Sequence, residues 1–208
     1  ELDEVDGENR LLGRMNVRRL EAETMRDAVL AVSGKLVTKP FGPPVPVSPD
    51  DVGQIVLAVD TRDSAGRPSG KIEALGDDEF RRSIYVQVRR SMPLGVLEPF
   101  DMPQMTPNCE KRAVSTAAPQ ALLMMNNSFV IQQADVVAQR IREKAGNDFA
   151  AQATLAWGLI FGRTPSESDV LAGVDFLTLP DATPEEQAAT LGHFCHALLS
   201  SNRFLYVD

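Results

Sequence analysis

Between residues 81 and 129, arginine, carboxylate and amide side chains recur among short apolar runs. The fork of N–H donors on an arginine suits planar or tetrahedral anions such as carboxylates and sulfates, and amides add neutral hydrogen bonds that suit sugars. The stretch therefore predicts a polar network that binds a small anion or a carbohydrate, with no catalytic residue assigned. Its candidate residues are Arg82, Arg89, Arg90, Asp101, Asn108, Arg112, Gln120, Asn126 and Asn127.

The same side chains also suit a closed internal network. Buried arginines need carboxylate or carbonyl partners, and Asp101 is the nearest candidate partner for Arg82 or Arg112. On this interpretation the network joins a small ribbon to the C-terminal helices. On the other interpretation it lines a groove. The two differ in whether the side chains of residues 81–129 fill a closed interior or line an open cleft.

Other signatures of catalysis or cofactor binding are missing from the sequence. It contains no P-loop, no Gly-x-Ser-x-Gly turn and no Cys-x-x-Cys-His haem attachment motif, so no cofactor is predicted in this segment. His193 and His196 share one helical face, but a metal site would need more matched ligands, and none is predicted. Cys109 and Cys195 could form one disulfide or remain two thiols.

Length and composition are those of an ordinary globular protein. The 208 residues, 43% apolar and 24% charged, suffice for one domain over residues 1–208 with a sizeable core. The net charge of -8 disfavours a general nucleic-acid binder, and no apolar run is long enough to span a bilayer. The chain opens on ELDEVDGENR, without Met or a signal peptide, and is therefore expected to be a piece of a larger protein.

Helical periodicity dominates the sequence outside residues 36–80. Apolar residues at helical spacing predict a helix that ends at Gly34, and from residue 117 onward a succession of helices is expected. The predicted fold is mainly α, a compact domain of four to six helices. The C-terminal helices are bounded by Asn127 or Ser128, by Asn147 or Asp148, and by capping boxes at residues 164–167 and 183–186.

Residues 36–80 are predicted to form an irregular loop and strand insertion, rich in Pro and Gly. Residues 54–59 suit a short strand that pairs with residues 83–88 in a small β-ribbon, although residues 83–88 also fit a short buried helix. Residues 61–78 are expected to be a long, loosely ordered loop. Near the start, Leu11, Leu12 and Met15 are spaced for one helical turn docked on a larger body.

Long ordered motifs in this chain resemble a planctomycete-enriched family of unknown function, PSD-one. The resemblance covers nearly the whole chain, and residues 36–79 are its weakest part. It rests on RRSIY, FDMP, NCEKR, TAAPQAL and NNSF in the central stretch. The head ENRLLGRM with RRLEAETMRDAVL and the tail segments WGLIFGRTPSESD and ALLSSNRFLYVD also match.

The resemblance implies context more than activity. Such domains usually end large proteins that carry a preceding domain of unknown function, often behind a cytochrome-c-like domain that would hold haem. It therefore implies an exported parent protein, in the periplasm or at the cell surface. The leading hypothesis is a non-catalytic structural or interaction module that docks on the preceding domain. The alternative is part of a hydrolytic or carbohydrate-processing site centred on Asp101 and neighbouring arginines.

Overall fold

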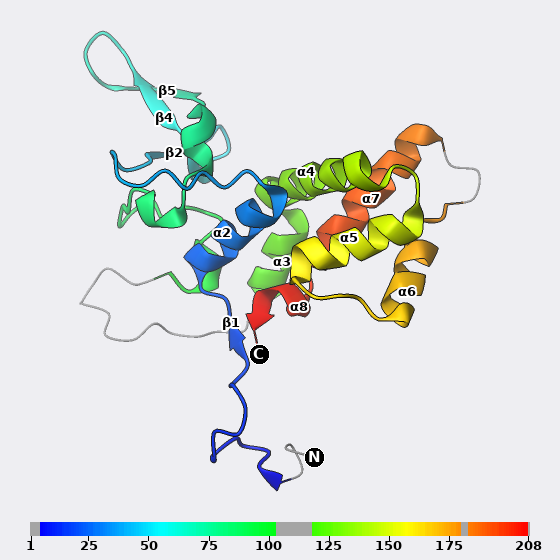
Figure 1. The fold of residues 1–208 in the computed structure, drawn as a ribbon. Coiled ribbons are helices and arrows are strands. Elements are labelled where there is room, and N and C mark those ends of the chain that lie inside the picture. Colours follow the sequence, from blue (N-terminus) through cyan, green and yellow to red (C-terminus); the bar gives the residue numbers. More distant parts are fainter. Residues whose placement is uncertain (1–4, 103–117, 180–182, 208) are drawn as a thin grey trace.

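The computed structural model describes residues 5–102, 118–179 and 183–207, and it confirms the expected mainly α fold (Figure 1). Six helices of nine or more residues make up the body of the described chain, and a four-residue helix follows them. They are α2 (Ala22–Ser33), α3 (Ala118–Asn126), α4 (Ser128–Ala145), α5 (Phe149–Phe161), α6 (Glu167–Leu177), α7 (Pro184–Leu199) and the short α8 (Asn202–Leu205).

Side-chain caps start the C-terminal helices where the sequence predicts. The Asn127 carboxamide accepts a backbone N–H at the start of α4, and the Asp148 carboxylate does the same for α5. Thr183 and Glu186 form the expected capping box of α7. The box of α6 lies two residues later than predicted, at Ser166, because the Asp169 carboxylate takes the reciprocal bond.

Helix α4 lies at the centre of the helical body and packs against α2, α3, α5 and α7. Apolar residues recur along α4 at helical spacing and form a single stripe that is buried away from water. The core continues into α5 and α7, whose side chains meet those of α4 (Figure 1). Its fully buried members include Val130, Val137, Ile141, Ala153, Ala156, Cys195 and Leu199.

The strands of the described residues form three small antiparallel pairs. The pair β1 (Arg18–Arg19) and β6 (Tyr206–Val207) brings the N-terminal segment to the end of the chain. The other pairs lie in the predicted insertion. They are β2 (Val47–Pro49) with β3 (Ile55–Leu57), and β4 (Val59–Arg62) with β5 (Pro68–Glu73).

The strand predicted at residues 54–59 is present as β3 and the start of β4, but its predicted partner is wrong. Ser83–Tyr85 is a single 3₁₀ turn, η2, and only Val86 bridges to Val45. The turn is held by α2, because the Ser83 backbone N–H donates to Asp27 at 2.7 Å and its hydroxyl accepts from Arg26 at 3.1 Å. These side-chain contacts over a long sequence separation override the alternating pattern of residues 83–88.

The prediction of a loose loop at residues 61–78 is also wrong. Most of this segment belongs to the β4–β5 hairpin, which projects from the helices in Figure 1. Asp63 starts the turn: its carboxylate accepts the N–H groups of Ala65 and Arg67. Gly66, at φ 76°, supplies the left-handed residue that closes the turn. The 3₁₀ turn η1 (Gly76–Phe80) then returns the chain to α2.

The N-terminal segment differs from its prediction as well. Leu11 and Leu12 are 80% and 76% exposed and form no helical turn, because Asp6 instead accepts backbone N–H groups and bends the chain. Within the ranges that the structure describes, no helix is both long and apolar enough to cross a membrane.

Candidate functional site

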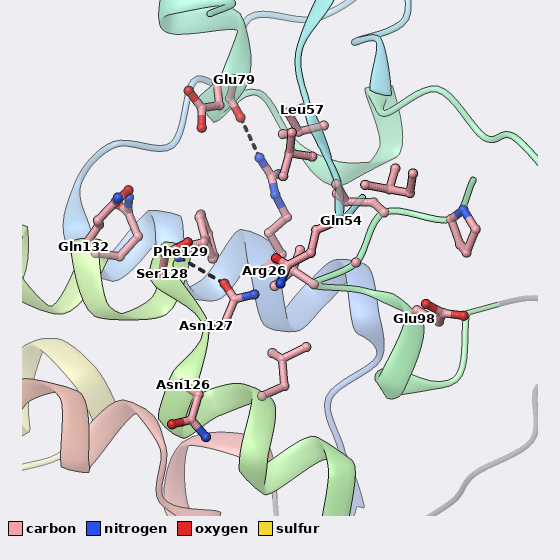
Figure 2. Close-up of a pocket in the computed structure, with 18 of the residues that line it drawn as sticks. Arg26, Gln54, Leu57, Glu79, Glu98, Asn126, Asn127, Ser128, Phe129 and Gln132 are labelled. Atoms are coloured by element: carbon pink, nitrogen blue, oxygen red, sulfur yellow. Dashed lines mark hydrogen bonds between the residues drawn. The ribbon is translucent and has the colours of Figure 1, made fainter. Parts of the chain in front are cut away.

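A cleft of about 1100 Å³ lies between the β2–β3 pair and the helices α2, α3 and α4 (Figure 2). Its walls come from three stretches far apart in sequence: residues 53–57, residues 93–98 and residues 119–133, with Arg26, Glu79 and Phe80 beside them. Clefts that hold small ligands have volumes of roughly 300–1,000 Å³. This one is therefore large enough for a ligand bigger than a typical small molecule.

Arg26 of α2 is the cation of the cleft wall, and only 1% of its surface is exposed. Its guanidinium donates to the carbonyls of Arg81 at 3.0 Å and Glu79 at 2.5 Å, and to the Ser83 hydroxyl at 3.1 Å. Burial lowers the pKa of Arg26 to about 10, which still leaves the side chain charged at neutral pH. Arg26 therefore fastens α2 to η1 and η2, and its guanidinium also lies 3.9 Å from the Asp27 carboxylate.

The remaining polar groups of the cleft are mainly neutral amides. Gln54, Asn126 and Gln132 are exposed at its wall, and Asn127 serves as the α4 cap (Figure 2). Two carboxylates also lie in the wall, the exposed Glu98 and the half-buried Glu79. Because Arg26 is buried and hydrogen-bonded, the solvent-facing charge of the described wall is negative. The cleft thus favours a ligand with neutral hydrogen-bonding groups and positive charge.

Of the nine residues predicted as a polar network, two line the cleft and five lie elsewhere. Asn126 and Asn127 line it. Asn108 and Arg112 lie outside the described residues. Arg82, Arg89 and Arg90 are exposed, and Asp101 is half-buried. Gln120 is buried, and its amide donates to the Pro99 carbonyl at 2.9 Å.

Asp101 pairs with an arginine that the sequence did not suggest. Arg19 of β1 donates to its carboxylate at 2.6 Å, and the guanidinium also lies 5.5 Å from the centre of the Phe100 ring. Asp101 has φ 59° and follows η3 (Glu98–Phe100), a left-handed position that Asp tolerates better than most residues. The pair joins the β1 segment to the turn after η3. Asp101 is not among the described residues that line the cleft.

Of the two partners that the sequence suggests for Asp101, Arg112 lies outside the described residues and Arg82 is wrong. The neighbouring Arg81 and Arg82 have opposite environments. Arg82 pairs with Asp27 at 3.2 Å, with 56% of its side chain exposed. Arg81 is 3% exposed, donates to the Pro43 carbonyl at 2.8 Å and stacks on the Tyr85 ring at 4.4 Å. The internal arginine contacts are thus made by Arg19, Arg26 and Arg81.

The histidines have separate surroundings. His196 bonds to the Met124 carbonyl at 2.8 Å and ties α7 to α3, while His193 is exposed. Among the described residues, no three His, Cys, Asp or Glu side chains gather closely enough to hold a metal ion. His196 therefore joins two helices of the body, and His193 faces solvent.

Cys195 is a free thiol in the core of α7. Burial, and secondarily the Asp135 carboxylate, raise the pKa of the Cys195 thiol to about 12, so almost no thiolate is present at neutral pH. Cys109 lies outside the described residues.

Cys195 is expected to react with a thiol reagent only when the protein unfolds, because the thiolate is the reactive form and the buried group stays protonated. In a Cys109→Ser variant, labelling by a maleimide at neutral pH should follow the unfolded fraction across a urea titration. Rapid labelling of the folded variant in the absence of urea would contradict this description of α7.

The residues that sequence reasoning missed are Arg26, Gln133 and the β3 edge. A signal for Arg26 was present, because it lies four residues after Ala22 and three before Val29, on the apolar face of α2. An arginine on that face has to find internal partners. Gln133 likewise lies on the buried face of α4, beside Val130 and Val137. The β3 edge carries no signal, because only its tertiary neighbours make it a cleft wall.

Comparisons with known proteins place the chain in a family without giving it an activity. No curated protein matches the sequence. No solved structure matches either. A family model described as a protein of unknown function, DUF1553 (PSD1), matches residues 1–177. The match spans most of the chain and agrees with the resemblance noted in its motifs. This chain therefore belongs to the PSD1 (DUF1553) family of proteins of unknown function.

Proposed function

We propose that this chain is a non-catalytic interaction module of a larger, exported, multidomain protein of the planctomycete type, and that the cleft is where it docks on another part of that protein. The preceding domain of the same parent is the favoured partner. Any haem of the parent would belong to a different domain. The proposal combines the family membership with the size and wall chemistry of the cleft.

The observation that carries the proposal is the chemical character of the cleft wall. Its exposed polar groups are mostly amides, which donate and accept hydrogen bonds but do not exchange protons at neutral pH. Its cation, Arg26, donates its hydrogen bonds to acceptors inside the protein. General acid–base chemistry needs titratable groups free to reach a substrate. A wall made mostly of amides and apolar side chains, with two carboxylates, is better suited to holding another protein segment.

Filling the cleft is expected to weaken docking. Asn126 is exposed at the end of α3, so Asn126→Trp should project an indole into the cleft without disturbing the core. We expect at least about a tenfold loss of affinity, a little over 1 kcal/mol, for the separately produced remainder of the parent polypeptide. Isothermal titration calorimetry measures it.

The matched control is Met125→Trp. Met125 precedes Asn126 in the same helix and is 59% exposed, but it is not among the described residues lining the cleft. This variant should bind like the wild type. Equal affinity of both Trp variants and the wild type would remove the cleft from the docking surface, and no measurable association of the wild type would overturn the proposed function itself.

A further inference from the structure

The outer edge of β3 is an unpaired strand edge, as the hydrogen bonds of the β2–β3 pair establish. In an antiparallel pair, residues that exchange hydrogen bonds alternate with residues that turn those groups away. The Asp50 N–H donates to the Gln54 carbonyl at 2.8 Å, and the Ala58 N–H donates to the Pro46 carbonyl at 3.3 Å. The register places Ser48 opposite Val56 between them. Residues 55 and 57 therefore direct their N–H and C=O groups away from β2.

One of these four outward groups is occupied within the protein. The Ile55 carbonyl accepts the Gly95 N–H at 3.0 Å, and the approach is so close that a Cβ on Gly95 would lie 3.3 Å from that oxygen. The Ile55 N–H and both backbone groups of Leu57 have no partner in the described part of the chain. Because residues 53–57 line the cleft, this short edge opens into it.

A second, independent observation comes from the helical wall of the same cleft. Gln133 of α4 is 4% exposed, and its side-chain carbonyl oxygen is buried without a hydrogen-bond partner among the described residues. A buried acceptor left without a donor costs about 1–3 kcal/mol. The cleft thus has backbone groups unpaired on its β3 side and an unpaired amide acceptor on its α4 side. Both sides lack hydrogen-bond partners that an incoming chain can supply.

We propose that the cleft binds an extended peptide segment of the partner, which adds as a strand to the outer edge of β3. This inference rests on the proposed function and specifies its mode of recognition. The outward groups repeat at every second residue, about 6.6 Å apart, which is the spacing at which a second strand presents its own N–H and C=O groups. Glu98 and Glu79 favour basic side chains on that segment.

A peptide selection with an N-methyl scan tests strand addition. A displayed library of random peptides of about ten residues is selected on the full chain, and bound peptides are kept if the Asn126→Trp variant binds them less well. Each amide of the best peptide is then N-methylated in turn. We expect methylation at every second position to weaken binding by about tenfold or more, and the intervening positions to tolerate it, because only alternate N–H groups face β3.

A matched pair of protein variants tests the same edge from the other side. Leu57→Pro removes the outward N–H but leaves the Ser48–Val56 bonds to β2, and proline is tolerated at such edge positions. Leu57→Ala also removes the leucine side chain but keeps the backbone N–H. We expect the Pro variant to bind the selected peptide about three- to tenfold more weakly than the Ala variant. The N-methyl scan on the wild type decides the question if the Pro variant does not fold.

The outcomes separate the two proposals. Peptides that depend on the cleft but show no alternation in the scan would overturn strand addition and leave an interaction module that binds through side chains. If no library peptide depends on the cleft, strand addition is wrong. The association of the chain with the rest of its parent, measured independently, then decides the proposed function.

Discussion

Replacing Arg26 with Met is expected to lower the free energy of unfolding by about 3–5 kcal/mol, measured by urea titration with circular dichroism. The substitution fills much of the same volume but removes every donor. It leaves the carbonyls of Arg81 and Glu79 and the hydroxyl of Ser83 without the guanidinium that now pairs them. Each buried acceptor left unsatisfied costs about 1–3 kcal/mol.

The matched control is Arg82→Met, the same chemical change in the same local region. Arg82 pairs with Asp27 at 3.2 Å, but 56% of its side chain is exposed. Surface ion pairs contribute roughly 0–1 kcal/mol, so this variant should unfold close to the wild type. Arg26→Lys should fall between the two, because a single ammonium cannot reach acceptors spread around a planar fork. An Arg26→Met variant as stable as Arg82→Met would contradict the role given to Arg26.

The consequence reaches the cleft as well as stability. Arg26 holds η1 and the residues before η2 against α2, and Glu79 and Phe80 of η1 form part of the cleft wall. A destabilised variant that still folds should therefore bind the partner segment less well than Arg82→Met does. The contacts of Arg26 thus determine the shape of the cleft wall, whereas the ion pair of Arg82 lies on the surface.

Sequence reasoning succeeded where the determinants are local. Helix starts at Asn127, Asp148 and Thr183 depend on a side chain bonding a backbone N–H two or three residues away, and such spacing is visible in one chain. The stop at Gly34 has the same character, since its φ of 78° suits glycine. The mainly α fold followed from these signals and from the apolar periodicity.

Sequence reasoning failed where the partners are distant in sequence. Residues 83–88 alternate like a strand, but Asp27 and Arg26 of α2 hold Ser83 in a turn. Two adjacent arginines could not be told apart by type. Although they are neighbours in the chain, Arg81 is buried and Arg82 is exposed. Which arginine meets internal acceptors is a property of the folded chain.

The candidate site shows the same division. Two of the nine residues singled out from the sequence, Asn126 and Asn127, line the cleft at a helix junction that the sequence does predict. The opposite wall is β3, whose open edge depends on pairing with β2 and on the approach of Gly95. No pattern within residues 54–59 indicates which edge of that strand stays unpaired. Residues of the polar stretch 81–129 therefore lie on one side of the cleft, and β3, which lies outside that stretch, forms the other side.

Two glycines inside helices are expected to respond to alanine with opposite signs. A Cβ added to Gly173 of α6 would lie 2.7 Å from the Ala153 Cβ and 3.1 Å from the Phe194 ring. Ala153 is fully buried in α5, so relief requires the helices to separate, and Gly173→Ala should destabilise the protein by about 1–3 kcal/mol. Gly158 of α5 has nothing within 4 Å, and Gly158→Ala should stabilise it by about 0.5–1 kcal/mol through helix propensity.

Urea unfolding of the two variants measures whether each substitution raises or lowers the free energy of unfolding. A third substitution tests whether the contact with Ala153 causes the loss expected for Gly173→Ala. Ala153→Gly removes the atom that the new methyl group meets, so adding it to Gly173→Ala should recover part of the loss, although Ala153→Gly alone is destabilising. Additive effects of the two substitutions would show that the α5–α6 contact is not the source of the penalty. If the effects of Gly173→Ala and Ala153→Gly are not additive, the close approach of α5 and α6 depends on the absence of a side chain at Gly173. Only glycine leaves room for Ala153 at that position.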